Sequence, residues 1–150
     1  MDIRTPLMQS AHMQMLDRIR RSRPHPALAP HFAVGKRGEE VAESHLRTLG
    51  YTIIGRNIKV GRHDEIDIIA FDPVDRVYVF AEVKSRSRGD SNFRPEINVT
   101  HKKRINMIRA ARSWMAKLNQ DVGYRMDVVC IVDGALADHF IEVPWKKGRR

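Results

Sequence analysis

The chain has 150 residues, with 27 Lys and Arg against 18 Asp and Glu, so its formal net charge is +9, and its length fits one domain with a core of its own. The basic excess predicts a polyanionic partner or an anionic membrane surface, while the single cysteine, Cys130, excludes an internal disulfide and a multi-cysteine zinc site. No apolar stretch approaches the ~20 residues that span a bilayer, and the first residues lack the apolar segment of a secretory signal, so we expect a cytoplasmic protein with no membrane partner.

Residues 1–32 differ in character from the rest of the chain. Their start contains several methionines and arginines, and three prolines between residues 24 and 30 interrupt any helix. We expect an N-terminal appendage that forms either a short helix or no fixed structure. The main domain is predicted over residues 33–144, and residues 145–150 form a basic tail.

Helical periodicity is clearest over residues 33–49, where apolar residues recur on one face. Gly50 is the expected terminator of this helix. Three strand candidates follow, at residues 51–57, 65–71 and 77–84. The turn sequence FDPVDR joins the last two and predicts an antiparallel hairpin.

The second half of the domain predicts one more helix and two more strands. The helix covers residues 101–119 with Thr100 as its N-cap. Its inward face is expected to contain Ile105, Ile108, Ala111, Met115 and Leu118. The apolar run 125–132 is typical of a central strand, and residues 139–144 predict an edge strand that Pro144 ends. The order α-β-β-β-α-β-β predicts an α/β fold.

An acid and a lysine stand near the end of the third strand candidate, VYVFAEVK. Residues two apart in a strand share a face, so Glu82 and Lys84 point the same way. Taken alone, the pair is explained by an ordinary salt bridge. The preceding strand, EIDIIAF, carries Asp67 between two isoleucines, and the hairpin predicts that Asp67 and Glu82 approach closely.

Two neighbouring carboxylates repel each other, and one of them is driven to protonate unless a cation lies between them. A hard divalent cation, Mg²⁺ or Mn²⁺, is the economical choice, because Mg²⁺ is usually held by one or two carboxylates, waters and substrate phosphate. Lys84, on the same face, could then orient and polarise the attacking water or the phosphate. Asp67, Glu82 and Lys84 therefore predict a site that hydrolyses a phosphodiester.

The first predicted helix offers a fourth acidic residue. At about 100° per residue, Glu39 lies at the edge of the apolar face, Glu40 points almost directly away from it, and Glu43 is intermediate. We therefore predict Glu39 as a site residue, with Glu40 and Glu43 in solvent. An ordinary glutamate at the boundary of the helix is the alternative interpretation.

Basic side chains are concentrated in one segment. Nine basic and two acidic residues lie between Lys84 and Arg112, which accounts for +7 of the net charge of +9. The basic residues expected nearest the acids are Arg86, Arg88, Lys102, Lys103 and Arg104. Such charges bind phosphate backbones with little base information. Phe93 is the only aromatic residue nearby, so the pattern favours duplex or branched DNA over a stacked single strand. A solvated basic face is the alternative.

Six motifs in the same order carry a resemblance to a known family. They are G-K-R-G-E (35–39), R-N (56–57), E-I-D-I-I-A (65–70), F-A-E-V-K (80–84), V-T-x-x-K (99–103) and R-M-D-V-V (125–129). The set resembles the YraN-type family of uncharacterised bacterial proteins. That family has a predicted endonuclease fold similar to archaeal Holliday-junction resolvases and to the wider PD-(D/E)xK nucleases. The resemblance implies a restriction-endonuclease-like core, in which a mixed β-sheet is flanked by helices.

The resemblance also implies roles for the acidic site. Asp67 and Glu82 match the metal ligands of the family, and the main-chain carbonyl of Val83 would add a third ligand. Lys84 matches the catalytic lysine, and Glu39 matches the acidic residue on the first helix.

Three further positions match the family, and one pair departs from it. Lys103 and Arg125 match basic positions that the resemblance implies contact phosphate. Asp127 also matches, and its role stays open between the site and a structural hydrogen bond. Where relatives usually carry glycine before E-I-D, this chain has His63 and Asp64. The added carboxylate could adjust the metal site or cap a turn, and His63 is expected to be a loop residue.

Three functions are compatible with these features. The leading one is a Mg²⁺-dependent endonuclease acting on DNA, including branched or damaged DNA. The second is a nucleic-acid-binding protein that retains the nuclease fold without cleaving. The third is an interaction module whose basic surface meets an acidic protein. Cutting both strands of a junction would suit a symmetric homodimer.

Overall fold

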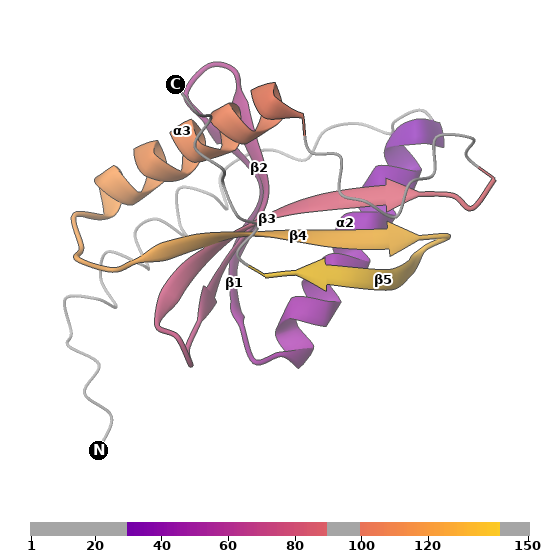
Figure 1. The fold of residues 1–150 in the computed structure, drawn as a ribbon, viewed down its shortest axis with the longest axis horizontal. Coiled ribbons are helices and arrows are strands. Elements are labelled where there is room, and N and C mark those ends of the chain that lie inside the picture. Colours follow the sequence, from indigo (N-terminus) through magenta and orange to yellow (C-terminus); the bar gives the residue numbers. More distant parts are fainter. Residues whose placement is uncertain (1–29, 90–99, 142–150) are drawn as a thin grey trace.

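The described part of the chain follows the predicted order α-β-β-β-α-β-β (Figure 1). The computed structural model describes residues 30–89 and 100–141. Its elements are α2 (Pro30–Thr48), β1 (Thr52–Val60), β2 (Asp64–Asp72), β3 (Val77–Arg86), α3 (His101–Leu118), β4 (Tyr124–Val132) and β5 (Ala135–Phe140). Most of the predicted appendage and all of the basic tail lie outside the described residues.

The five strands form one mixed sheet in the order β1-β2-β3-β4-β5. The neighbours β3 and β4 run parallel, whereas the other three pairs are antiparallel. A parallel pair needs a long crossover connection, and α3 lies within it. The predicted hairpin of β2 and β3 is confirmed, and β4 is central as predicted.

The last strand lies at the edge of the sheet as predicted, but its predicted bounds, residues 139–144, were wrong, because it covers Ala135–Phe140. Pro144, its predicted end, lies outside the described residues. β5 begins at Ala135, because Asp133 and Gly134 make a tight connection from β4 in which both residues have positive φ, 50° and 77°. Such a two-residue turn allows pairing to start at once. The Asp-Gly pair was the signal for this hairpin.

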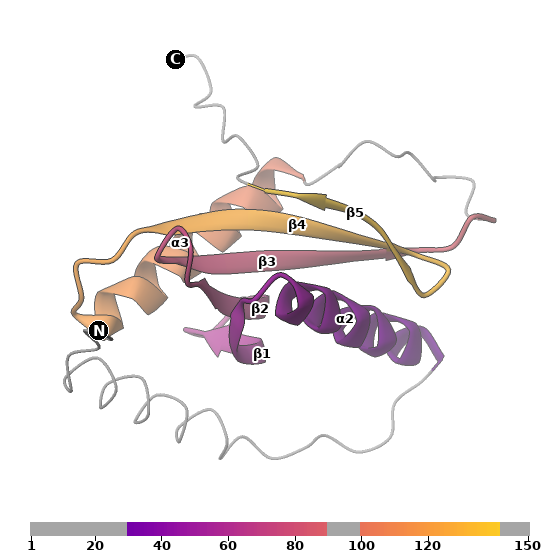
Figure 2. The ribbon, with the colours of Figure 1, turned by 90° about the horizontal axis from the view of Figure 1, so that it is seen from below.

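The two helices cover opposite faces of the sheet (Figures 1 and 2). Consecutive residues of β3 illustrate this arrangement, because Phe80 packs in the cluster under α3 and Ala81 packs in the cluster under α2. The larger cluster includes Met107, Trp114 and Leu118 of α3. Within the described residues, no helix is long and apolar enough to cross a membrane.

The inward face of α3 is confirmed for Ala111 and Leu118, and Ile108 and Met115 pack partly buried against the same cluster. The prediction was wrong for Ile105 and missed the residues around Trp114. Its buried residues are Met107, Ala110, Ala111, Trp114 and Leu118, whereas Ile105 is 47% exposed. Trp114 determines the difference, because its ring packs edge to face against Tyr78 and Phe80 with centroid distances of 5.0 and 5.7 Å. The predicted N-cap is confirmed, because the Thr100 hydroxyl accepts a hydrogen bond from the Lys103 N–H at 3.2 Å.

Gly38 lets α2 approach β3 closely. A Cβ atom at this position would lie 1.9 Å from Ser85 Oγ and 3.2 Å from Ser85 Cβ. Contacts that short force neighbours to move. Gly38 directly precedes Glu39, so the same close approach determines where the acidic residue of α2 lies relative to the sheet.

Substitution of Gly38 by alanine is expected to lower the free energy of unfolding by about 1–3 kcal/mol through this overlap. Removing the opposing side chain, in the double variant with Ser85→Gly, should recover part of the loss. Urea denaturation measures both, with Gly89→Ala as the control because a Cβ there meets nothing within 4 Å. Equal stabilities for Gly38→Ala and the wild type would contradict the packing argument.

Candidate functional site

The site is built where β2 and β3 separate. Their backbone register runs from Asp72 opposite Val77 to Ile68 opposite Ala81. Beyond that pair, the N–H of Val83 donates to Oδ2 of Asp67 at 2.8 Å. A side-chain carboxylate therefore continues the contact between the two strands.

Glu82 is the buried acid at this fork, with only 4% of the residue exposed. Its two carboxylate oxygens contact different lysines. The Nζ of Lys84 lies 3.1 Å from Oε1, and the Nζ of Lys103 lies 3.1 Å from Oε2. Lys84 comes from the same strand and Lys103 from the first turn of α3, so the sheet and the helix meet on this carboxylate.

The pKa of Asp67 is shifted in the direction that the sequence predicts for an acid beside Glu82. Burial, and then repulsion from Glu82, raise the pKa of Asp67 to about 7, although the Val83 N–H and the Lys103 ammonium oppose the rise. Burial alone would lower the pKa of Lys103, but its attraction and hydrogen bond to Glu82 raise it above the ordinary value. The two acids and Lys103 thus form one electrostatic unit.

This raised pKa predicts a pH-dependent stability that asparagine should abolish. Between the ordinary value of 3.8 and about 7, the folded Asp67 carboxyl holds a proton that the unfolded chain has released. Folded-state stability is therefore lost as pH rises through this window, by at most about 1.4 kcal/mol per pH unit.

We expect the stability of Asp67→Asn relative to the wild type to increase steadily across that window. Urea unfolding in the presence of a chelator, at several pH values from about 4 to about 8, measures the difference. A constant difference between the two proteins would contradict the raised pKa.

Glu39 joins the same unit from α2. Its carboxylate Oε2 accepts a hydrogen bond from Nδ2 of Asn57 at 2.6 Å, and Asn57 itself has a left-handed backbone with φ of 49°. Burial raises the pKa of Glu39 despite that hydrogen bond, and the charge of Glu39 in turn raises the pKa of Asp67. Three acids from α2, β2 and β3 therefore influence one another.

The other two glutamates of α2 differ from Glu39. Glu40 is exposed, as predicted. Glu43, however, binds Arg47 at 2.8 Å and Arg56 at 3.0 Å. Arg56 and Asn57, the R-N motif, thus each contact a glutamate of α2, a role that the sequence alone did not suggest.

Three of the six predicted nucleic-acid-binding residues are exposed. Arg86, Arg88 and Lys102 are exposed, and Lys103 is partly buried against Glu82. Arg88 contacts Asp133 through its backbone N–H at 3.1 Å, and its side chain is 84% exposed. Arg104 is partly buried and has interactions within the protein.

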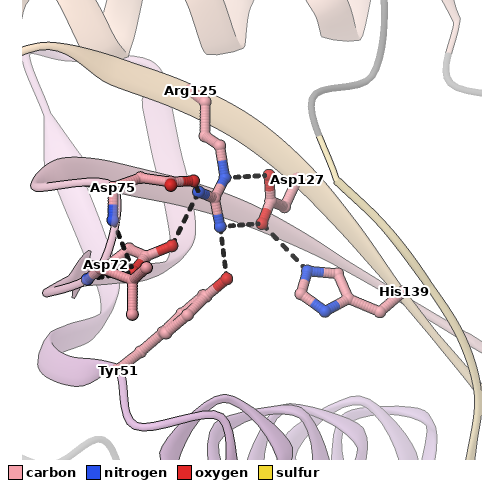
Figure 3. A network of polar contacts seen from close by, with 7 residues as sticks. Tyr51, Asp72, Asp75, Arg125, Asp127 and His139 are labelled. Atoms are coloured by element: carbon pink, nitrogen blue, oxygen red, sulfur yellow. Dashed lines mark hydrogen bonds and ion pairs between the residues drawn. The ribbon is translucent and has the colours of Figure 1, made fainter.

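Arg125 is not on this surface, so its predicted contact with phosphate was wrong. Its side chain is 4% exposed and is surrounded by protein groups (Figure 3). It donates to Asp72 and Asp75 at 2.9 Å each, to Asp127 at 3.1 Å, and to the hydroxyl of Tyr51. The guanidinium therefore binds protein groups in the interior of the fold.

The same network assigns Asp127 a structural role. Asp127 is fully buried, and besides Arg125 its Oδ2 contacts Nε2 of His139 at 2.9 Å (Figure 3). His139 then contacts His45 of α2 through ring nitrogens 3.0 Å apart. Of the two roles left open by the sequence, the hydrogen-bonded one is confirmed.

Asp64 is held by a helix and not by the acidic pair. Its two oxygens accept hydrogen bonds from Arg109 at 2.7 and 2.8 Å, and the hydrogen bond from Arg109 lowers the pKa of Asp64. The added carboxylate therefore connects the start of β2 to α3. His63 is an exposed turn residue, as predicted.

Asp67 and Glu82 carry carboxylate oxygens of the kind that hard divalent cations prefer. Among residues 30–89 and 100–141 no group of three or more His, Cys, Asp or Glu side chains is arranged to hold a metal ion. Two carboxylates are nevertheless the usual protein share for Mg²⁺, which keeps several of its waters. The carbonyl of Val83 as a third ligand stays a prediction.

The fold and these contacts define a mixed-sheet α/β protein whose acidic and basic side chains converge where two strands separate. The chain belongs to the uncharacterised protein family UPF0102, whose family model matches residues 38–131. The family resemblance seen in the sequence is thereby confirmed.

Relatives from several bacteria carry the same family designation. A UPF0102 protein of Chlorobium limicola is 38% identical over 128 residues, which cover 79% of this chain and 95% of the relative. One from Prosthecochloris aestuarii is 41% identical over 107 residues, covering 71% and 80%. One from Koribacter versatilis is 35% identical over 109 residues, covering 72% and 74%. The residues that the family model matches include the fork between β2 and β3.

Proposed function

We propose that this chain is a cytoplasmic, Mg²⁺-dependent endonuclease that hydrolyses phosphodiester bonds in duplex or branched DNA. One observation carries the proposal. Asp67 and Glu82 are the next residues beyond the last backbone pair of β2 and β3, and burial together with repulsion from Glu82 raises the pKa of Asp67 to about 7. A carboxylate pair under this repulsion favours a divalent cation.

The residues at the fork fit Mg²⁺ or Mn²⁺. Asp67 and Glu82 would hold the ion, with the Val83 carbonyl as the predicted third protein ligand and water in the remaining positions. When bound, such an ion supplies Lewis-acid activation of a phosphoryl oxygen. Binding would also remove the repulsion that keeps a proton on Asp67.

Lys84 and Glu39 provide the remaining groups for hydrolysis. In this reaction a water oxygen forms a bond to phosphorus, the bond from phosphorus to the leaving sugar oxygen breaks, a proton leaves the water, and the leaving oxygen takes up a proton from solvent. Lys84 is 27% exposed and can stabilise the negative charge that develops on the phosphoryl oxygens. Glu39 has a pKa raised by burial, which suits a proton acceptor.

The basic residues beside the fork support DNA as the substrate. Arg86, Arg88 and Lys102 are exposed. Arg86 ends β3, Arg88 follows it, and Lys102 lies in the first turn of α3. Charges of this kind bind the phosphate backbone, with an affinity that falls steeply as salt rises. Contacts to phosphate carry little information about the base sequence, so we expect the protein to recognise the shape of DNA and not its sequence.

A second candidate is a nucleic-acid-binding protein that keeps the fold without cleaving. The specific observation in its favour is that both oxygens of Glu82 already contact lysines, each at 3.1 Å. An acid whose charge is compensated in this way can be purely structural. This candidate needs only the basic surface.

Cleavage assays on the purified protein separate the two candidates. End-labelled four-way junctions, nicked duplex, linear duplex and single strands would each be incubated with Mg²⁺, with Mn²⁺ and with chelator. The endonuclease is expected to cleave at least one of the structured substrates, and only with metal. Binding to all of them without any cleavage would reject the enzyme and establish the second candidate.

A further inference from the structure

Lys103 lies against one of the two acids that the proposed divalent cation would need. It reaches Glu82 from α3, whereas Lys84 reaches the other oxygen from within β3. The Lys103 ammonium also attracts Asp67, as its effect on that carboxyl indicates. An ammonium that attracts both acids reduces their mutual repulsion, which is what a bound metal ion would also do.

The two lysines at the fork already offset most of the acidic charge. Asp67, Glu82 and Glu39 carry three negative charges when ionised, against the two ammonium groups of Lys84 and Lys103, so the unit has a charge of −1. A divalent ion added to this unit would leave a charge of +1 beside a buried glutamate. Uncompensated charge is costly where water is excluded. Backbone phosphates of DNA, each carrying one negative charge, would restore the balance.

We propose that Lys103 leaves Glu82 for a backbone phosphate when DNA binds, so that metal and DNA bind cooperatively. The inference rests on the endonuclease proposal, because it takes Asp67 and Glu82 as the metal ligands. Lys103 is suited to the exchange because its long side chain is 35% exposed, against 6% for Glu82. Reciprocity requires that DNA strengthen metal binding by the same factor as metal strengthens DNA binding.

Calorimetric titration of the DNA-free protein with Mn²⁺ tests the competition directly. At about pH 8.5, above the pKa of Asp67, we expect Lys103→Met to bind Mn²⁺ about tenfold more tightly than the wild type, because one positive charge has gone. Lys103→Gln, which removes the charge but keeps a hydrogen-bond donor, should behave alike. Lys117→Met is the matched control, an exposed lysine in the last turn of the same helix.

The cooperativity is measured with Ca²⁺ as the metal and an uncut four-way junction as the DNA. The wild type should bind the junction about tenfold more tightly with Ca²⁺ than with chelator, and Lys103→Met should lose most of this difference. Circular dichroism would confirm that each variant is folded.

The outcomes separate this inference from the function on which it rests. Metal binding by the wild type that Lys103→Met and Lys103→Gln leave unchanged or weaken would overturn the role of Lys103 alone. If no variant binds Mn²⁺, with or without DNA, the endonuclease proposal fails as well.

Discussion

Replacement of Arg125 by methionine is expected to lower the free energy of unfolding by about 3–5 kcal/mol, the usual cost of removing one partner from a buried ion pair. Methionine keeps much of the length of the side chain but none of its charge. The fully buried Asp127 and the 4% exposed Asp72 would then lose their cation. Asp127 would keep the His139 ring and Asp72 two backbone N–H groups, but a buried carboxylate without a cation is costly to keep ionised.

The pKa of Asp72 shows how strongly Arg125 acts. Burial alone would raise it, yet the hydrogen bond from Arg125, together with the backbone N–H groups of Val74 and Asp75, holds it below the ordinary value. A carboxyl whose pKa is lowered in the folded state stabilises the fold at pH values above its unfolded pKa. This stabilisation is lost as pH falls through the folded pKa. Part of the stability that Arg125 provides should therefore disappear in acid.

Urea unfolding near neutral pH measures the loss, with Arg112→Met as the control because Arg112 is an exposed arginine of α3. An exposed substitution of this kind should change stability by about 0.5 kcal/mol or less. Arg125→Lys should recover little, because an ammonium lacks the planar fork that reaches several acceptors at once. If Arg125→Met were as stable as the wild type but bound DNA poorly, the result would contradict the structural role and favour the phosphate contact predicted from the sequence.

Hydrophobic periodicity and turn sequences predicted those parts of the site that come from elements adjacent in the sequence. The hairpin followed from the turn between β2 and β3, and strand alternation then placed Asp67 beside Glu82. Helical geometry separated Glu39 from Glu40 because the two residues lie about 100° apart around the axis. Each of these inferences needs only local geometry and one strand pairing.

Contacts between distant segments were not predictable in the same way. Arg125 is the second residue of the largely apolar β4, and its burial depends on Asp72 from another strand and on Tyr51 beyond the end of α2. The spacing of Arg125 and Asp127, two residues apart on one face of β4, was the available signal. The inward face of α3 was likewise ambiguous, because apolar residues occur on more than one side of that helix.

Asp67→Asn and Glu82→Gln are each expected to reduce cleavage by about a thousandfold, equivalent to about 4 kcal/mol in the activation barrier. Both substitutions keep the shape of the side chain and remove the negative charge that would hold the divalent ion. DNA affinity should be unchanged or higher in the absence of metal, because a repulsive charge has been removed near the phosphates. This opposite response of cleavage and binding distinguishes loss of catalysis from loss of folding.

Single-turnover cleavage and DNA binding in chelator would be measured on the same preparations, with Glu40→Gln as the matched control. Glu40 is the exposed neighbour of Glu39 on α2, so its amide variant should cleave like the wild type. Cleavage that persists in both Asp67→Asn and Glu82→Gln would remove the two acids from the mechanism. The raised pKa of Asp67 would then reflect only the electrostatic strain of a buried acid pair, and the proposed metal site between β2 and β3 would have no catalytic role.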